Sequence, residues 1–454
     1  MFDLPRRSPT DRGWKTRSLR AMLQRRSERN RPDLPLLSVA RERGVFVRSS
    51  TDDNHNSIPD DLSNYKVARK GDLVVNKMKA WQGSLGLAPV DGIVSPAYFV
   101  FQAAFAVPQF GEYLLRSRPY VAKFAAASDG VRVGQWDLSI PHMRSIEVQL
   151  PAKAEQIAIV KYLVHASARI DSAIAAKLRM LELLSELHQA QRNSVLSSIP
   201  VGASQTQTSL SQSANLIQTG PFGSQLHASE YVHGGIPVIN PSHLTSGGIE
   251  PELEVTVTRE KALELRRHSL AVGDVIAARR GDLGRCSIVS PGEAGWLCGT
   301  GSLIIRLRQD LWLPEFFQIA FSAPSTREQL TLRSVGSTMA NLNAEQVSSL
   351  RVPRPSLEAQ RIAVEEISRL ELAHERRITA IKAEVVLLQE FRTRLVADVV
   401  TGQVDVREVA AKLPDAPEAA VDLAPDFDEE LTQGVERAAS SEPDFFPTAN
   451  GVTI

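Results

Sequence analysis

The segment PAKAEQIAIV at residues 151–160 returns, with small changes, as PSLEAQRIAV at residues 355–364. The two copies are 204 residues apart, and the same separation relates Glu186 to Glu390. A period of this length is far too long for a solenoid of short repeats. It indicates a duplicated module, in which each copy is a globular half followed by a similar helix.

Each copy of this segment begins a stretch with the apolar spacing of a long helix. Apolar residues recur at mostly three- and four-residue steps through residues 155–197 and 357–399, which is typical of a heptad-like seam. Pro151 and Pro355 stand just upstream, and Gly402 stands at the end of the second stretch. We predict that the two helices pair as an antiparallel coiled coil; the alternative is that each packs only on its own domain. The seam residues expected are Ile157, Val160, Val164, Ile170, Ile174, Leu178, Leu181, Leu184 and Leu187 on the first helix, and Ile367, Leu370, Ile378, Ile381, Val385, Leu388, Leu395 and Val399 on the second.

The residues before each helix have the pattern of mixed α/β (α+β) domains rich in strands. Short β-branched and aromatic runs alternate with turns of Gly, Pro and Ser, as strands do. The strands expected are 72–78, 86–90 and 97–101 in the first half, and 236–240, 274–279, 286–289 and 302–307 in the second. Short helices are expected at residues 111–127 and 314–332. The boundaries that follow are a basic N-terminal arm at 1–34, a first globular domain at 35–150, a central helix at 151–200, a second globular domain at 201–351, a C-terminal helix at 352–411 and an acidic, disordered tail at 412–454.

Charge is unevenly distributed along the 454 residues, although 52 Lys and Arg balance 52 Asp and Glu. Residues 412–454 contain ten acidic and two basic residues, which leaves 50 basic and 42 acidic residues in residues 1–411. The folded part therefore carries a net charge of +8 and the tail is acidic. Such a separation of charge is a hint of nucleic-acid binding.

The sequence contains no recognisable catalytic or metal-binding constellation. It has no Gly-Lys-[Ser/Thr] phosphate-binding loop, and none of its twelve lysines follows an acidic residue by two positions, as in many nucleases. Its two cysteines are too far apart for a zinc site and indicate a reducing compartment. Residues 240–243 begin like an amino-methyltransferase motif, but they lack its second proline and its aromatic residue, so we interpret them as a turn. No apolar run is long enough to cross a membrane.

Two loops in matching positions offer side chains that can contact DNA. In the first half, residues 71–83 end a strand in a glycine-bounded loop, and residues 277–285 correspond to them in the second half. Lys and Arg can contact phosphate or guanine, and Asn and Gln can bind adenine. The alternative is a solvated hairpin tip. The candidates are Asn76, Lys77, Lys79 and Gln82 in the first half, and Arg279, Arg280 and Arg285 in the second.

Further candidates lie in small-residue loops. Residues 128–135 and 334–341 form a second matched pair, whose backbone N–H groups could grip a phosphate; the alternative is a tight connection. Residues 220–225 form a third loop, found only in the second half. Trp81, Trp136 and Trp296 are interpreted as anchors of the core or loops. The candidate DNA-contacting residues here are Arg132, Gln135, Ser224, Gln225, Ser337 and Asn341.

Taken in order, these features resemble the specificity (S) subunits of type I restriction–modification systems. The residues that carry the resemblance are the Gly-Pro-Phe-Gly-Ser run at 220–224, the Gly-Asp strands at 71–75 and 273–277, the loop at 336–342 and the two proline–glutamine helix starts. No single motif is stringent, but their order, duplication and spacing are specific across residues 35–411. The first half departs from the pattern because it lacks a clear Gly-Pro-Phe-Gly loop, and the acidic tail is not part of it.

The resemblance implies a DNA-binding subunit that performs no chemistry itself. Each globular half would be a target recognition domain reading one half of a split site in double-stranded DNA. The helices would be spacers that dock two methyltransferase subunits, which bind S-adenosylmethionine and methylate adenine; optional restriction (motor–nuclease) subunits would use ATP and Mg. This chain would bind no cofactor or metal and would be cytoplasmic, in a prokaryote. The candidate docking residues are Gln156, Glu186, Gln360 and Glu390.

The length of the helices suggests how far apart the two half-sites lie. A helix of about 35–40 residues is roughly 50–60 Å long, whereas one turn of DNA is about 34 Å. We therefore expect half-sites around one to one and a half turns apart. The rival hypothesis is a non-catalytic coiled-coil scaffold or adaptor without sequence-specific DNA reading. A self-contained modification enzyme and a helix-turn-helix transcription factor are less compatible, because neither motif is present.

Overall fold

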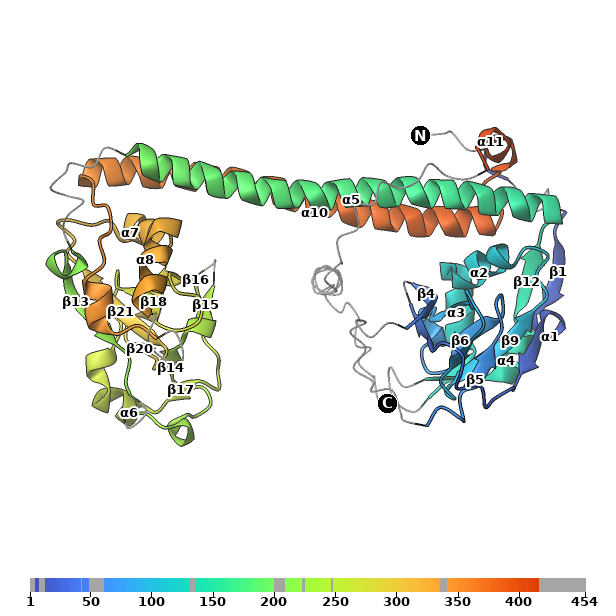
Figure 1. Ribbon diagram of the computed structural model, residues 1–454, viewed down its shortest axis with the longest axis horizontal. Helices are drawn as coiled ribbons and strands as arrows, with labels where there is room; N and C mark the ends of the chain where they lie inside the picture. Colours follow the sequence, from blue (N-terminus) through green and yellow to red (C-terminus); the bar gives the residue numbers. More distant parts are fainter. Residues whose placement is uncertain are drawn as a thin grey trace, which may run out of the picture. The chain divides into compact units, whose positions relative to one another are not determined.

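The computed structural model describes residues 5–7, 13–41, 43–48, 61–130, 136–199, 209–222, 225–245, 248–334 and 341–415. They form two compact units of mixed helix and sheet (Figure 1). The first unit lies within Met1–Met180 and Ala380–Ile454, and the second lies within Leu181–Thr379. Two long helices each contribute residues to both units, so the fold is α+β with two globular domains and a helical pair.

A four-stranded antiparallel sheet forms the centre of the first unit. Its strand order is β2-β9-β6-β7. Leu73 and Val75 point into a core shared with helices, whereas Val74 points into a second core on the other face, as strand alternation requires. The four strands are β2 (Leu23–Arg26), β6 (Leu73–Asn76), β7 (Leu85–Leu87) and β9 (Tyr98–Ala103).

Smaller strand pairs and short helices complete the first unit. The antiparallel pairs are β1 (Lys15–Ser18) with β12 (Glu147–Leu150), β3 (Leu37–Ala40) with β4 (Gly44–Val47), β5 (Lys66–Ala68) with β8 (Gly92–Val94), and β10 (Ser128–Asp129) with β11 (Asp137–Leu138). The helices are α1 (Leu19–Met22), α2 (Pro108–Arg116), α3 (Arg118–Ala126), α4 (Ile140–Ser145) and, near the end of the described chain, α11 (Arg407–Lys412).

The beginning of the chain differs from the basic arm that we expected at residues 1–34. Strand β1 pairs with β12, and β2 is an edge strand of the central sheet. Leu19, Met22 and Leu23 are buried in the core of the first unit. The arginines around them give the segment a basic composition, and this conceals three core residues that only the packed structure reveals.

The second unit repeats the central sheet of the first. Its strand order is β13-β21-β18-β19. These strands correspond in turn to β2, β9, β6 and β7 of the first sheet, so the two sheets have the same order. These strands are β13 (Ala214–Thr219), β18 (Val275–Ala278), β19 (Cys286–Ile288) and β21 (Ser302–Leu307). The predicted duplication therefore extends to the topology of the globular halves.

Additional short elements surround this sheet. The second unit also contains the three-stranded arrangement of β14 (Ile236–Ile239) between β17 (Thr256–Val257) and β20 (Leu297–Cys298), and the pair β15 (Leu244–Thr245) with β16 (Gly248–Ile249). Its short helices are α6 (Arg259–Glu264), α7 (Pro314–Phe321), α8 (Pro324–Ser334) and α9 (Ala344–Ser348). The segment that we interpreted as a turn is the 3₁₀ turn η5 (Pro241–His243).

The expected helices at 111–127 and 314–332 are each two helices. The first is interrupted at Ser117, which has extended backbone angles and precedes an Arg-Pro pair. The second is interrupted before Pro324. Proline lacks the N–H needed inside a helix and disfavours helical geometry in the residue before it. The sequence pattern thus located the helical regions but missed a break in each.

The Gly-Asp motifs of the repeat form the same turn in both units. Gly71 and Gly273 have φ values of +84° and +81°, a conformation that glycine adopts without strain. The following aspartates are buried and accept hydrogen bonds from the backbone N–H three residues earlier, at 3.0 Å for Asp72 and 2.8 Å for Asp274. The motif is therefore a structural turn that begins β6 and β18.

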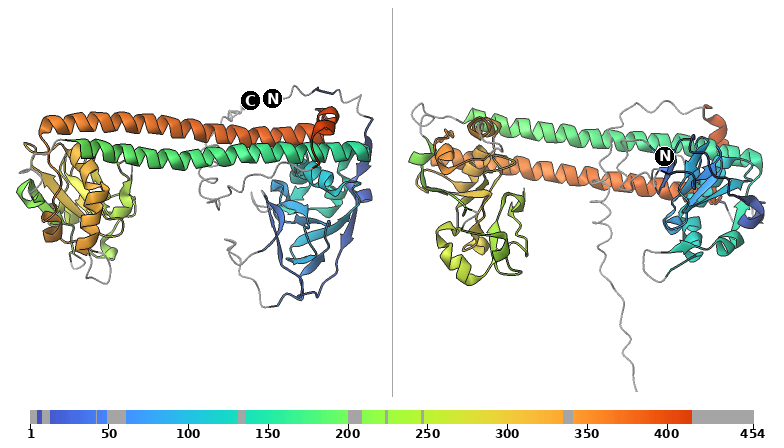
Figure 2. Two further views of the ribbon diagram at one scale, coloured as in Figure 1. Left: turned by 45° about the horizontal axis from the view of Figure 1, so that its top comes forward. Right: turned by 60° about the horizontal axis from the view of Figure 1, so that its bottom comes forward.

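The two long helices pair in antiparallel fashion, as predicted. They are α5 (Lys153–Ser198) and α10 (Leu357–Val400), with 46 and 44 residues, and are longer than the 35–40 residues that we expected. Residues farther along α5 meet residues earlier in α10, and Figures 1 and 2 show the helices side by side. The cross-helix contacts are Lys177 with Glu384 and Asp171 with Arg392 in the first unit, and Arg192 with Glu371 and His188 with His374 in the second.

The predicted seam is correct for α10 and partly wrong for α5. Every seam residue expected on α10 is buried or half-buried. On α5, however, Ile157, Val164 and Leu187 are exposed, and Ile159 and Leu163 are buried instead. The first turns of α5 pack on the globular domain of the first unit as well as on α10. This second contact shifts the buried face away from the one that heptad spacing predicts.

Candidate nucleic-acid interface

The strand β6 of the first unit ends at Asn76, where we predicted a DNA-facing loop. The Asn76 carboxamide oxygen accepts a hydrogen bond from the Met78 backbone N–H at 3.1 Å, which closes the turn locally. Lys77 forms an ion pair with Asp137, and the Leu138 N–H donates to the Lys77 carbonyl at 3.0 Å. Asn76 and Lys77 are therefore already engaged within the unit.

The rest of this loop is anchored by two tryptophans. Trp81 Nε1 donates a hydrogen bond to the Met78 carbonyl at 3.1 Å, and the ring centroids of Trp81 and Trp136 are 5.0 Å apart. Their role as loop anchors agrees with the interpretation from sequence. Of the other predicted residues, Lys79 is exposed and Gln82 is half-buried. Lys79 is thus the better placed of the two to meet a ligand.

A second group of cations in the first unit was missed by the sequence analysis. Lys66 on β5 is 6% exposed, and its Nζ donates to two backbone carbonyls at 2.6 Å. The Arg25 guanidinium lies 5.4 Å and Lys66 Nζ lies 5.7 Å from the centroid of the Phe99 ring. Burial lowers the pKa of Lys66, and the neighbouring Arg25 and Arg29 lower it further. These residues come from different strands, so no sequence spacing reveals the group.

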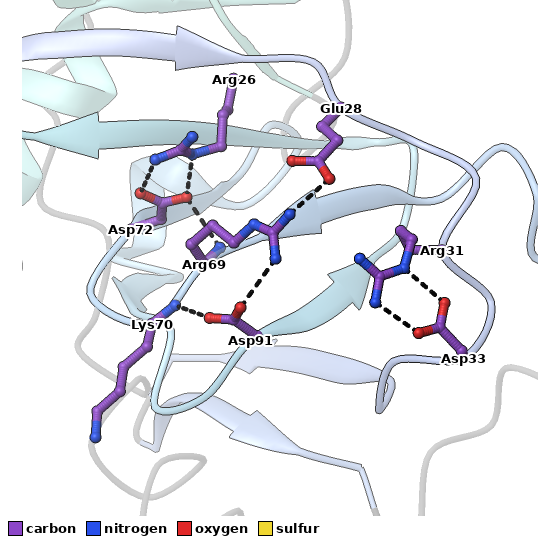
Figure 3. A network of polar contacts seen from close by, with 8 residues as sticks. All are labelled: Arg26, Glu28, Arg31, Asp33, Arg69, Lys70, Asp72 and Asp91. Atoms are coloured by element: carbon purple, nitrogen blue, oxygen red, sulfur yellow. Dashed lines mark hydrogen bonds and ion pairs between the residues drawn. The ribbon is translucent and has the colours of Figure 1, made fainter.

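Other arginines of the first unit are neutralised by acids, as Figure 3 shows. Arg26 Nε contacts Asp72 at 2.6 Å, and Arg69 contacts both Glu28 and Asp91 at 2.7 and 3.0 Å. These ion pairs connect β2 to the turns around β6. Part of the basic excess of residues 1–411 therefore stabilises the fold and is not available to a partner.

In the second unit, the end of β18 carries two adjacent arginines. Arg279 is 7% exposed, and its Nε donates to Asn341 Oδ1 at 2.9 Å. Arg279 Nη1 and Arg280 Nη2 lie 3.4 and 3.2 Å from the Thr300 carbonyl oxygen. The Leu342 N–H donates to the Arg279 carbonyl at 2.9 Å. The structure thus brings together three predicted residues, Arg279, Arg280 and Asn341, from loops 62 positions apart.

Phe222, from the glycine-rich segment 220–225, lies near Arg279. Phe222 is 61% exposed, and the Arg279 Cζ is 5.9 Å from the centroid of its ring. The predicted residue Gln225 accepts a hydrogen bond from the Phe222 N–H at 3.1 Å, so its side chain holds the loop. A Cβ atom on Gly220 would lie 1.9 Å from the Gly299 carbonyl oxygen, so only glycine permits this approach. Phe222 itself was not among the predicted candidates.

Arg285, the remaining predicted arginine, is part of an ion-pair network. Its Nε contacts Asp282 at 3.1 Å, and the same carboxylate pairs with Arg327 of α8. Gly284 between them has a φ of +97°. The pair holds the β18–β19 turn against α8, and this position favours a structural role for Arg285.

Comparison with known proteins finds a family match over most of the second unit. Residues 220–384 match the family described as the type I restriction modification DNA specificity domain. This stretch is a type I DNA specificity domain. It includes Phe222, Gln225, Arg279 and Asn341, so the polar group at the end of β18 lies inside the matched domain. No curated protein sequence matches the chain.

Solved structures extend the likeness to nearly the whole chain. A chain from a study of complex assembly and conformational transition in a type I R-M system is similar with a TM-score of 0.63 and 16% identity, over 89% of this chain and 100% of that chain. The HsdS subunit of Thermoanaerobacter tengcongensis is similar with a TM-score of 0.50 and 15% identity, over 88% and 98% of the two chains. These likenesses show that the fold of nearly the whole chain is shared with these proteins, and the family match covers residues 220–384.

Two of the predicted docking residues are not on the surface of the chain. Gln156 and Gln360 are almost fully buried, and each holds the start of its long helix to its own globular domain. The Gln156 Oε1 accepts from the Val107 N–H at 3.1 Å, at the start of α2. The Gln360 Oε1 accepts from the Leu313 N–H at 2.9 Å, at the start of α7. Their proposed docking role is therefore wrong, whereas Glu186 and Glu390 are exposed.

Arg132, Gln135, Ser224 and Ser337 lie outside the described residues. Within the described residues of the chain, no three His, Cys, Asp or Glu side chains gather as metal ligands would. No helix in that part is long and apolar enough to cross a membrane.

Proposed function

We propose that this chain is the DNA sequence-recognition subunit of a type I restriction–modification complex, with each globular unit reading one half of a split target. The observation that carries the proposal is the duplicated sheet. Three of the four strands of its second copy, β18, β19 and β21, lie in the matched specificity domain. In each copy, one inner strand of the sheet (β6 in the first unit, β18 in the second) ends in a loop with cationic side chains. Double-stranded DNA is the ligand that such loops fit.

The chain supplies recognition, and its partners supply chemistry. Two methyltransferase subunits would bind S-adenosylmethionine and methylate adenine, and any restriction subunits would bring ATP and Mg. The DNA-contacting residues of the first unit would include Lys79, Arg25 and Arg29, and those of the second would include Arg279 and Arg280.

The helical pair offers two equivalent docking surfaces for identical partners. Leu183 and Leu187 of α5 are exposed in the second unit, and Leu387 and Phe391 of α10 are exposed in the first. The two pairs are related by the 204-residue repeat, and Glu186 and Glu390 lie beside them at matching positions. Exposed apolar residues in a repeated arrangement mark interaction sites. A duplicated surface fits two copies of one partner.

This docking proposal is tested by removing one surface at a time. Leu183→Ser with Leu187→Ser should leave a complex with one methyltransferase per chain instead of two, as measured by native mass spectrometry. Leu387→Ser with Phe391→Ser should do the same. Leu332→Ser, at an exposed leucine of α8, is the matched control and should retain two. If both double variants still bind two methyltransferases, the docking surface lies elsewhere.

Methylome sequencing tests the recognition function. The chain is co-expressed with methyltransferase subunits from the same genome in a host that lacks such systems, and modified adenines are mapped. We expect a split motif with a fixed gap that disappears when this chain is omitted. A soluble complex that methylates no defined motif would instead favour the scaffold hypothesis.

The helical pair should set the gap between the half-sites. Deleting residues 176–182 from α5 and 380–386 from α10 removes seven facing residues from each helix, including the Lys177–Glu384 ion pair. Seven residues are about two helical turns, or about 10 Å, which corresponds to roughly three base pairs. We expect a gap about three base pairs shorter with unchanged half-sites. Altered half-sites with an unchanged gap would contradict the spacer role.

A further inference from the structure

Arg279 carries a charge that no described residue of the second unit neutralises. The strand before it, β18, is buried along its whole length, and the arginine side chain is buried with it. Its hydrogen-bond partners are neutral: the Asn341 side chain at 2.9 Å and, at 3.4 Å, the Thr300 carbonyl. Among the described residues, no carboxylate lies within ion-pair distance of Arg279 or of Arg280. Burying an unpaired charge costs free energy, so this arrangement requires a reason.

The local environment makes the charge still less favourable in the free protein. Burial lowers the pKa of Arg279, and the adjacent Arg280 lowers it further. The guanidinium is nonetheless held in place on its Nε side. Its Nη2 makes no hydrogen bond within the described residues. The open end of the fork is therefore available to an acceptor from outside the chain.

An exposed aromatic ring lies near the Arg279 guanidinium. Phe222 is 61% exposed and stands 5.9 Å from the Arg279 Cζ, measured to the ring centroid. Gly220 packs closely against Gly299, and the Phe222 N–H donates a hydrogen bond to Gln225, so Phe222 is held by contacts on its own backbone and next to it. A phenyl ring held in solvent beside a guanidinium is a surface on which a base or a sugar can pack.

In the first unit, the cation at the equivalent position has a different partner. Repeat alignment matches Lys77 to Arg279 and Asp137 to Asn341, and the backbone hydrogen bonds from Leu138 and Leu342 confirm that the positions are equivalent. Lys77 and Asp137 form an ion pair, so the cation is neutralised there. The second unit has an amide where the first has a carboxylate. The unneutralised guanidinium is thus a specific property of the second unit.

We propose that Arg279 is a specificity-determining residue of the second half-site, whose Nη atoms donate to the acceptor edge of a guanine in the major groove. Asn341 is its positioning residue, and Phe222 packs against the adjacent nucleotide. Arginine and guanine O6 and N7 form the commonest specific contact between protein and DNA, because the fork matches the two acceptors. A backbone phosphate offers similar acceptor chemistry, and the experiment distinguishes the two sources. The inference rests on the proposed function.

The test uses the full chain in complex with its methyltransferase subunits. The wild-type motif is first obtained by methylome sequencing, and binding is then measured on duplexes that carry it, with each base pair of the second half-site changed in turn. Arg279→Ala should weaken binding to the cognate duplex about 10- to 100-fold. The Arg279→Ala complex should bind one of the altered duplexes, in which a guanine of the second half-site is replaced, as tightly as it binds the cognate duplex. Its methylome should be relaxed at that base pair only.

Two further variants separate the role in DNA reading from a role in folding. Asn341→Asp keeps the hydrogen-bond acceptor for Arg279 Nε but supplies the carboxylate found in the first unit. We expect it to raise the melting temperature while weakening cognate binding at least about fivefold, a combination that a merely structural contact would not produce. Arg285→Ala, which breaks an ion pair in the same turn, is the control and should leave the motif unchanged.

The outcomes distinguish the competing explanations. If Arg279→Ala weakens binding equally for every altered duplex, the acceptor is a phosphate and the guanine assignment is overturned. Unchanged binding of Arg279→Ala and Asn341→Asp would overturn the proposal altogether. If the wild-type complex produces no defined motif, the proposed function fails first, and this failure is visible before any variant is measured.

Discussion

The two units have the same central sheet but balance their charges differently at both ends of one strand. At the start of β6, Asp72 is paired with Arg26 from β2, whereas the equivalent Asp274 is paired with Arg306 from β21. At the end of the strand, the first unit closes an ion pair and the second leaves Arg279 on a neutral amide. The backbone turn, by contrast, is the same in both.

This difference separates what the duplication preserved from what it left free to change. The strand order, the Gly-Asp turn and the buried glutamine at each helix start recur because they satisfy backbone hydrogen bonds, which any copy of the fold must do. Loop-end charges carry no such constraint, so they can diverge between copies. The halves would therefore read different DNA sequences on the same scaffold.

The largest expected effect comes from removing the buried aspartates of the two turns. Asp274→Ala should lower the free energy of unfolding by about 3–5 kcal/mol, because it leaves Arg306 and the Ala271 N–H without their acceptor. Asp72→Ala should cost less, since its second contact with Arg26 is longer, at 3.3 Å. Urea denaturation measures both. The control is Asp310→Ala, at an exposed ion pair, which should change stability by less than about 0.5 kcal/mol.

The buried glutamines should rank next. Gln360→Ala removes a side chain that accepts from Leu313 and donates to the Leu311 and Pro355 carbonyls, so we expect a loss of about 2–3 kcal/mol. Gln156→Ala removes two hydrogen bonds, and about 1–2 kcal/mol is expected. Thermal denaturation of the full chain is the measurement, with Gln189→Ala on the exposed side of α5 as the control. If Gln360→Ala and Gln156→Ala lowered the stability by equal and small amounts, the glutamine hydrogen bonds would not be what holds the helix starts.

Acid should weaken the second unit through three histidines. Burial lowers the pKa of His188, His243 and His268, so the folded state prefers each of them neutral. The unfolded chain binds more protons below its ordinary histidine pKa of about 6.5, so stability is lost as pH falls below that value. Each group contributes at most about 1.4 kcal/mol per pH unit.

Denaturation at pH 7.5 and 5.5 measures this loss. His188 stacks on His374 with 4.3 Å between the ring centroids. His188→Gln should reduce the dependence of stability on pH, because it removes one of the three protons taken up on unfolding. A pH dependence that is unchanged in this variant would show that His188 does not contribute.

The smallest effect concerns the cysteines, both of which belong to the second unit. Burial raises the pKa of Cys286 to about 12 and raises that of Cys298 as well, so almost no thiolate is present in the folded state. We expect negligible alkylation of the native chain at pH 8, measured by mass spectrometry. Asp274→Ala should accelerate the labelling and Asp72→Ala should not. Rapid labelling of the wild-type chain would contradict the burial of these thiols.

Much of the fold could be predicted because its signals are local or repeat along the chain. Apolar spacing located both long helices, and β-branched runs located the inner strands. The errors occurred where a residue's neighbours are distant in sequence. Gln156 and Gln360 are polar and recur in the repeat, so they resembled docking residues, but each reaches a helix start 49 or 47 positions away. Ile159 replaces Ile157 in the core because the globular domain covers that face of α5.

The candidate interface was predicted in part for the same reason. Arg279, Arg280 and Asn341 were found because strand ends and glycine-rich loops are visible in the sequence. Phe222, Lys66 and Arg25 were not, since the exposure of a phenyl ring or the burial of a lysine depends on what the fold places around it. Arg285 resembled its neighbours in sequence, yet its charge is balanced by Asp282.

The sequence by itself determined the duplication, the helical pair, three of the four strands of each central sheet and the family that the chain resembles. All of these follow from periodicity and turn residues, which act between near neighbours. Only the tertiary structure decided which cations are neutralised and which are left open. Ion pairing depends on distances between side chains that the chain brings together from far apart, so the same basic composition conceals an ion pair at Lys77 and an unpaired guanidinium at Arg279.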